Sequence, residues 1–125
     1  MKGAFFLSFD DRIFDKICTL LVARGGSCSG AEIEGQIDVQ GKLFTVYGPA
    51  EPEWEFREPP FVAAPGASIP DMTRVRGFVI ECRWEDLFVE MVRDIAALSE
   101  GGAWVLDGDG VVWCADNVDP GLVRL

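Results

Sequence analysis

The sequence contains no histidine, and this absence removes a whole group of sites. Without an imidazole, the chain cannot build a Ser-His-Asp triad, a histidine metal site or a histidine proton shuttle. Basic residues are also scarce, because the 125 residues include 11 lysines and arginines against 21 aspartates and glutamates, a net charge of −10. Such an excess of acid repels phosphates, so we do not expect the chain to bind nucleic acid by itself.

Long hydrophobic runs and paired cysteines are missing as well. The first apolar stretch, residues 4–9, ends at two aspartates and is too short for a signal peptide or a membrane span. None of the four cysteines, Cys18, Cys28, Cys82 and Cys114, forms a C-x-x-C pair, so neither a zinc site nor a disulfide-rich secreted scaffold is indicated. We expect reduced, mostly buried thiols in a cytoplasmic protein without metal or cofactor, and a disulfide or a reactive thiol is the alternative.

Sequence motifs of catalysis are lacking too. Residues 25–30 are rich in glycine and serine but contain no lysine and precede a strand, which indicates a flexible connection and not a phosphate loop. The run Asp107-Gly108-Asp109-Gly110 resembles the start of a calcium loop, but apolar residues follow it where further ligands would be needed. We expect a hairpin turn there. No catalytic residue is predicted, and an enzyme that uses carboxylates or a cysteine is the last of three functional hypotheses.

What the sequence does contain is a globular composition with an internal repeat. Hydrophobic residues make up 49% of the chain, which at this length suffices for one domain, residues 1–125, with a substantial core. A shift of 74 positions aligns the apolar residues of the two halves. The pattern predicts two tandem strand-helix-strand-strand units, residues 1–47 and 74–125, joined by an acidic, proline-rich loop, residues 48–73.

In the first unit, residues 4–9 are expected to form a central strand, and Asp10 to cap a helix that ends at Gly25-Gly26. Apolar and polar residues then alternate over residues 31–39, which predicts a half-buried strand. Its solvent side would carry Glu32, Glu34, Gln36 and Asp38. A turn at Gln40-Gly41 would lead into residues 42–47 and complete a hairpin.

In the second unit, residues 77–83 are expected to form a strand, and the acidic residues after Trp84 open a helix. A two-residue turn at Gly108-Asp109 would place Trp104 opposite Trp113 in a second hairpin. That hairpin is apolar on both faces, so one face needs a cover. A second copy of the chain could supply it, which makes a homodimer a prediction.

Together these elements predict an α+β fold with one curved antiparallel sheet and both helices on one face. The other face would be covered by the loop, by a ligand or by another chain. In its order of elements, the chain resembles the duplicated small-molecule-sensing domains of the GyrI-like type. That resemblance implies binding of cationic compounds by a central carboxylate and aromatic residues, and it assigns no residue of this sequence.

The loop suggests a function, because it interleaves acidic residues with large aromatic ones. Buried aromatic side chains ringed by charge can anchor a basic partner. The leading hypothesis is therefore an inhibitor or immunity-type protein that masks a basic toxin or nuclease, without membrane or nucleic-acid binding. The residues predicted to bind this partner are Glu51, Glu53, Trp54, Glu55, Phe56 and Glu58 in the loop and Glu32, Glu34 and Asp38 in the strand.

A domain that binds a cationic small molecule is the alternative, with Glu81, Trp84 and Trp113 near a cleft, and with Trp54 from the loop. Glu81 lies in an apolar strand, where a covered carboxylate would have a raised pKa or an arginine partner. Arg83 lies two residues further on the same side of the strand, so an exposed or paired Glu81 is the simpler interpretation.

Overall fold

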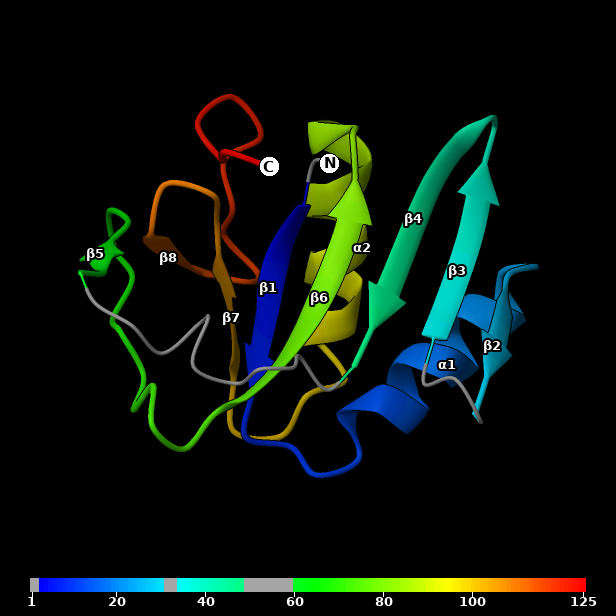
Figure 1. The fold of residues 1–125 in the computed structure, drawn as a ribbon, viewed down its shortest axis with the longest axis horizontal. Coiled ribbons are helices and arrows are strands. Elements are labelled where there is room, and N and C mark those ends of the chain that lie inside the picture. Colours follow the sequence, from blue (N-terminus) through cyan, green and yellow to red (C-terminus); the bar gives the residue numbers. More distant parts are fainter. Residues whose placement is uncertain (1–2, 31–33, 49–59) are drawn as a thin grey trace.

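The computed structural model describes residues 3–30, 34–48 and 60–125, and within them it shows an eight-stranded sheet with two helices (Figure 1). The predicted α+β class is confirmed. The elements are β1 (Gly3–Ser8), α1 (Ile13–Ala23), β2 (Ser27–Ser29), β3 (Glu34–Val39), β4 (Lys42–Tyr47), β5 (Val62–Ala63), β6 (Arg76–Cys82), α2 (Glu85–Ala96), β7 (Ala103–Leu106) and β8 (Val111–Cys114).

The strand order is β2-β3-β4-β6-β1-β7-β8-β5, so the first strands of the two halves, β1 and β6, lie side by side near the middle. All neighbours are antiparallel except β5 and β8, which pair in parallel. The expectation of a purely antiparallel sheet is therefore wrong at this one edge. Residues 25–30, expected to be a flexible connection, contain the edge strand β2, because Ser27–Ser29 pair with the start of β3.

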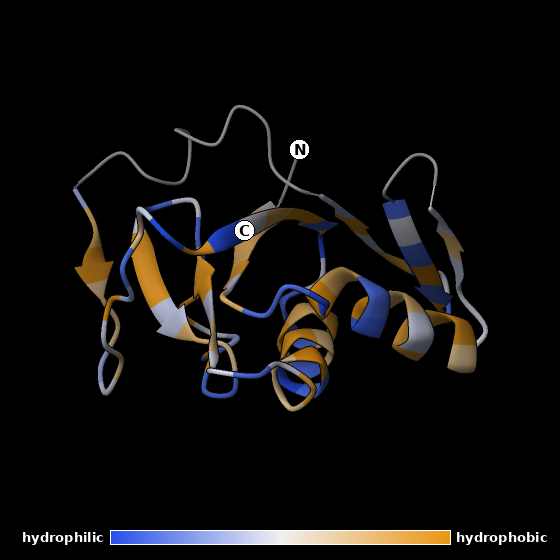
Figure 2. Ribbon diagram, turned by 90° about the horizontal axis from the view of Figure 1, so that it is seen from below, coloured by the Kyte–Doolittle hydropathy of each residue, from blue (hydrophilic) through white to orange (hydrophobic). Residues whose placement is uncertain are grey.

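Both helices pack on the same face of the sheet (Figure 2). Their apolar positions recur at helical spacing and so fall on one side of each helix. The main core forms where these side chains meet the strand residues that point the same way, and it includes fully buried phenylalanines from β1, β4 and α2. Its largest fully buried side chains include Phe6, Phe44, Phe88, Ile17 and Leu21.

Asp10 was expected to cap α1, but the N-cap position is Arg12, and Asp10 acts two residues earlier. Its Oδ1 accepts the backbone N–H of Arg12 at 2.9 Å, and its Oδ2 accepts the N–H of Glu100 at 2.9 Å and the Lys16 ammonium at 2.6 Å. These bonds, with the Lys16 bond the largest contribution, lower the pKa of Asp10 to about 2. The carboxylate thus ties the start of α1 to the turn that follows α2.

The end of α1 is made by two glycines, as predicted. Gly25 has φ 91°, a left-handed conformation that favours glycine, and the N–H of Gly26 donates to the carbonyl of Leu21 at 2.7 Å. A side chain on Gly26 would collide with the carbonyl oxygens of Leu21 and Gln36. The chain can therefore reverse tightly and bring β2 back along the helix.

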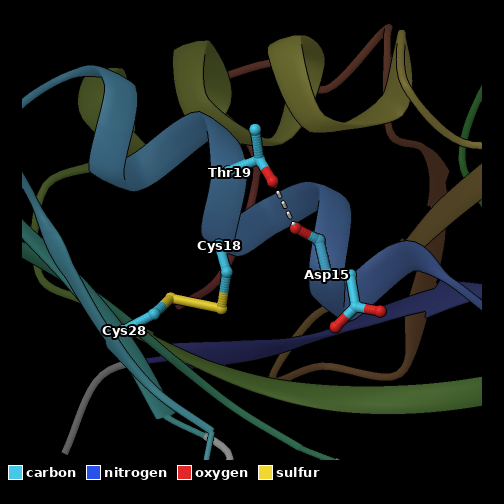
Figure 3. The surroundings of a disulfide bond; sticks show 4 residues. All are labelled: Asp15, Cys18, Thr19 and Cys28. Carbon is cyan, nitrogen blue, oxygen red and sulfur yellow. Dashed lines mark hydrogen bonds between the residues drawn. A yellow bond between two sulfur atoms is a disulfide. The ribbon is translucent and has the colours of Figure 1, made fainter.

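This reversal brings Cys18 of α1 and Cys28 of β2 together, and they form a disulfide with their Cα atoms 5.6 Å apart (Figure 3). The expectation that all four cysteines are reduced is wrong for this pair. The bond depends on the distance that the helix-to-strand turn creates, and cysteine spacing in the sequence does not show that distance. Cys82 and Cys114 are free.

The second hairpin forms at the predicted place but with a different register. Trp104 pairs with Cys114, and Val105 pairs with Trp113. The turn is one residue longer than expected because the Asp107 carboxylate organises it, accepting the N–H groups of Asp109 and Val111 and the indole N–H of Trp113. A shift of one residue moves a side chain to the other face, so Trp113 packs in the main core on the helix side and Trp104 does not.

The second face of this hairpin is covered within the chain. A smaller apolar cluster lies on the side of the sheet away from the helices and includes Leu7, Leu106 and Val112 from the strands and Met72 and Val75 from the segment before β6. The same segment supplies β5, which pairs with the outer edge of β8. The predicted cover for the second face of the hairpin is therefore supplied by this chain. A homodimer stays a prediction.

Candidate binding face

The side of the sheet that carries no helix is apolar over some strands and polar or acidic over others. Over β1, β7 and β8 it holds the smaller apolar cluster. Over β3, β4 and β6 it holds the residues that alternate with core positions, and these are mostly polar or acidic. We call this second region the acidic sheet face, and it consists of Glu34, Gln36, Asp38, Leu43, Thr45, Tyr47 and Glu81.

Cross-strand pairing brings the functional groups of this face into one row. Tyr47 lies opposite Glu34 of β3, and Thr45 lies opposite both Gln36 of β3 and Glu81 of β6. Residues paired in this way have Cβ atoms about 5 Å apart. The Tyr47 hydroxyl donates to Oε2 of Glu81 at 3.3 Å, so a phenol lies between two carboxylates.

This position changes the chemistry of Tyr47. Burial raises its pKa, and the negative charges of Glu81 and Glu34 raise it further. The phenol therefore stays protonated and donates to Glu81. The local field around Tyr47 is negative and favours a positive charge brought into contact with it.

Two carboxylates of this face, those of Glu34 and Glu81, have no cationic partner among the described residues. Within the described part of the chain, neither Glu34 nor Glu81 has a lysine or arginine nitrogen within 4.0 Å, and Arg83 does not pair with Glu81. Lys42 of β4 contacts α2 instead, with its ammonium 3.3 Å from the Asp86 carboxylate. Among the described residues, the basic side chains of these strands thus do not compensate the charge of Glu34 and Glu81.

The hydroxyl of Thr45 has no hydrogen bond to any residue that the structure describes. Its side chain shares the acidic sheet face with Tyr47 and Glu81, yet it is only 4% exposed. In the described ranges, no hydrogen-bond donor or acceptor reaches its hydroxyl. A buried hydroxyl of this kind costs free energy unless a partner satisfies it, so it calls for an explanation.

A small hollow adjoins the row on the side of β1. Its volume is about 230 Å³, and its lining is largely apolar. Phe5, Val79 and Leu106 contribute side chains on this face, and Glu81 lies at the border between the hollow and the row. The volume is below the roughly 300–1,000 Å³ of typical small-molecule pockets.

The residues predicted from sequence are distributed over several places. Glu34, Asp38 and Glu81 share the acidic sheet face, although one Asp38 oxygen is occupied by the N–H of Gly41 at 2.7 Å, in the turn after β3. The described part of the chain does not include the remaining predicted partner-binding residues. These are Glu32, Glu51, Glu53, Trp54, Glu55, Phe56 and Glu58.

The residues predicted for a small ligand do not meet. Trp113 is buried on the helix side, where its indole N–H donates to Asp107 at 3.0 Å, so it lies on the opposite face from Glu81. Trp84 precedes α2 and is 43% exposed, with the Lys42 ammonium 5.2 Å from its ring centre. Tyr47 and Thr45 were not among the site residues predicted from the sequence. Their alternation with the apolar residues Phe44 and Val46 is the signal that could have placed them on the opposite face of the strand.

Two other chemically active groups, the Cys82 thiol and the Asp107 carboxylate, are shielded or serve the fold. Burial raises the pKa of the Cys82 thiol, which donates to the carbonyl of Trp84 at 3.5 Å. The Asp107 carboxylate is held by the hairpin, and no group of metal-binding side chains is present in residues 3–30, 34–48 and 60–125. Within the same ranges, neither helix has the length and apolarity needed to cross a bilayer.

Comparison with family models, with curated proteins and with solved structures finds no match for this chain.

Proposed function

We propose that the chain is a protein-binding module, an inhibitor or immunity-type protein, that masks a basic toxin or nuclease with its acidic sheet face. The observation that carries this proposal is the row of Glu34, Tyr47 and Glu81, in which two carboxylates without cationic partners among the described residues flank an aromatic side chain. Opposite charge steers such partners together and suppresses wrong ones. Tyrosine is among the residues that contribute most to protein interfaces.

The shape of the face favours a protein over a small molecule. Side chains on three adjacent strands present a broad surface, and the adjoining hollow is small. The acidic and aromatic residues of the connecting loop, predicted above to bind the partner, belong to the same proposal. The net charge of −10 acts in the same direction.

A cation-binding small-molecule domain is the second candidate. The hollow beside Glu81 favours it, because an apolar lining with one carboxylate at the border suits a ligand with a hydrophobic body and a positive charge. In this case Glu81 and Phe5 would contact the ligand, and Trp113 would take no part.

Two further parts of the proposal concern origin and location. The tandem repeat is supported by the central placement of β1 and β6, each followed by a helix on the same face.

A cytoplasmic location suits an inhibitor of an intracellular toxin, whereas a disulfide is more typical of oxidising compartments. Trapping the thiols of Cys18 and Cys28 in the source cells tests the location: a reduced pair agrees with the cytoplasm, and an oxidised pair contradicts it.

The test of function compares two variants with equal charge changes. The double variant Glu34→Gln and Glu81→Gln neutralises the face, and Asp15→Asn with Glu90→Gln neutralises two exposed carboxylates on the helices. The wild-type chain and the helix variant should retain one basic protein from source-cell lysate at low salt, and the face variant should lose it. The purified partner should then be inhibited by the wild-type chain. Equal capture by both variants, or a captured protein whose activity is unaffected, would refute the proposal.

A further inference from the structure

Three features on the acidic sheet face point to one type of ligand group. Glu81 provides a carboxylate without a cationic partner in the described ranges, Thr45 provides a buried hydroxyl without a hydrogen bond there, and Tyr47 provides an aromatic ring. The first two are direct cross-strand neighbours, so one planar group can contact both. The Thr45 hydroxyl is independent of the acidic residues, and none of the described residues satisfies it, so a donor brought to this face would find a free acceptor there.

We propose that this row is the binding site for one arginine side chain of the partner, with its guanidinium on Glu81 and Thr45 and against the ring of Tyr47. The inference rests on the proposed function, since it names the group of the basic partner that this face recognises. Glu34, on the other side of Tyr47, adds a second negative charge next to the ring.

A guanidinium fits this set better than an ammonium. It offers five N–H donors in one plane, so it can bond a carboxylate and a hydroxyl at once and still stack on an aromatic ring. An ammonium is a compact point charge that is more strongly hydrated. Cations over a tyrosine ring gain further stabilisation, and the gain is larger where water is excluded.

The hollow accounts for the rest of the side chain. An arginine carries three methylenes before its guanidinium, and such stems pack on apolar surface while the head reaches a polar group. Val79 and Leu106 line the hollow on one side of Glu81, and Thr45 lies on the other. A volume of about 230 Å³ suits one side chain better than a whole drug-sized ligand.

The inference is tested with N-acetyl-L-arginine amide as probe, added to the purified full chain and followed by amide NMR shifts. A single side chain should bind with a dissociation constant of about a few millimolar. The saturating shifts should centre on Thr45, Tyr47 and Glu81. The lysine derivative should bind more weakly, and the citrulline derivative, which has the shape of arginine without its charge, should not bind.

Variants separate the contributions of individual groups. Glu81→Gln should weaken the arginine probe about tenfold, because a charge-assisted bond becomes a neutral one. Thr45→Val keeps the shape and should weaken binding without lowering the free energy of unfolding, since the hydroxyl it removes has no bond to lose. Glu90→Gln on α2 is the matched control and should leave binding unchanged.

Several results would overturn the arginine site. These are equal affinity for arginine and citrulline derivatives, unchanged affinity in Glu81→Gln, shifts centred on other strands, and no saturation. The failure of this inference differs from that of the proposed function. If a basic protein is captured and inhibited but Thr45→Val and Glu81→Gln bind it normally, only the arginine site is refuted. If the probe binds as expected but no basic protein is inhibited, only the function is refuted.

Discussion

The two halves of the helix-free face belong to the same sheet, but one half is apolar and covered by the chain, whereas the other carries acidic and polar side chains. Over β1, β7 and β8 the strand residues are apolar, and Met72 and Val75 from the same chain pack on them. Over β3, β4 and β6 the residues are mostly acidic or polar, and Glu34 and Glu81 lack cationic partners in the described ranges. The apolar half therefore contributes to folding through burial, and the acidic half retains the charge that the proposed partner would bind.

The same contrast holds between individual carboxylates. Asp107, at the end of β7, accepts hydrogen bonds from the N–H groups of Asp109, Val111 and Arg124 and from the Trp113 indole. Among the residues that the structure describes, Glu81 accepts one bond, from Tyr47. A carboxylate with many internal donors stabilises the fold, whereas a carboxylate with few remains able to bind another molecule.

The largest effect is expected from Asp107→Ala. The substitution leaves the buried indole N–H of Trp113 and neighbouring backbone N–H groups without acceptors, which should cost about 3 kcal/mol or more of unfolding free energy. Urea denaturation measures this cost. Asp109→Ala is the control, since its ion pair with Arg124 at 3.7 Å is solvent-exposed and should contribute less than about 1 kcal/mol. Similar losses in both variants would contradict the structural role of Asp107.

Removal of the disulfide should have the next largest effect on the free energy of unfolding. The bond joins α1 to β2, which pairs with β3 of the acidic sheet face. Cys18 and Cys28 are separated by 10 positions, and closing a loop of that size should stabilise the fold by about 2.5 kcal/mol. Urea denaturation with and without reductant measures this value. The double variant Cys18→Ser and Cys28→Ser should match the reduced protein and no longer respond to reductant. An equally stable reduced protein would show that the bond does not support α1 and β2.

Met72→Ala tests the cover of the apolar half. Met72 is 7% exposed within the smaller cluster, and truncation of a buried methionine should cost about 2 kcal/mol. Ile69→Ala is the control from the same segment, because Ile69 is 41% exposed. Equal and small losses in both variants would mean that the segment before β6 does not stabilise the sheet.

The dependence of stability on pH should show the contribution of Asp10. Its pKa in the folded protein is about 2, below the usual value near 3.8, so its stabilising effect is complete above the unfolded pKa and is lost as the pH falls through about 2. The melting temperature of the wild type should therefore fall between about pH 5 and pH 2 more than that of Asp10→Asn. Parallel curves would contradict the role of the Lys16 and Glu100 bonds.

The smallest effect on stability is expected from Glu81→Gln. Because Glu81 has few internal bonds, its neutralisation should change the unfolding free energy by less than about 0.5 kcal/mol, while the arginine probe binds more weakly. Urea denaturation and the NMR titration are made on the same sample. A large loss of stability would show that Glu81 belongs to the fold, as Asp107 does.

Much of this fold could be predicted from local patterns. The helical spacing of Ile13, Ile17 and Leu21 predicts α1, and the two glycines after the helix predict where it ends. The predicted turn at Gln40-Gly41 has positive φ at both residues and forms as expected. The register of the second hairpin could not be predicted, because it depends on how many donors the Asp107 carboxylate gathers.

The candidate site shows the same limit. The alternation along β3 placed Glu34 and Asp38 on one face, and the position of Glu81 in an apolar strand marked it as unusual. Tyr47 and Thr45 lie beside Glu34 and Glu81 only because β4 pairs with both β3 and β6, and the sequence does not show this strand order. Trp113 was predicted to lie near a cleft with Glu81, but the register of the second hairpin differs by one residue from the predicted one, and this difference turns Trp113 to the helix side of the sheet.

The sequence by itself determined the α+β class, the two helices, the two hairpins and the absence of any histidine-based chemistry, because these depend on composition and on patterns within about ten residues. The tertiary structure decided the strand order, the Cys18–Cys28 bond, the cover of the apolar half and the row of Glu34, Tyr47 and Glu81. Each of these joins residues from different elements. Their distances are set by how the whole sheet assembles, and no local pattern encodes that assembly.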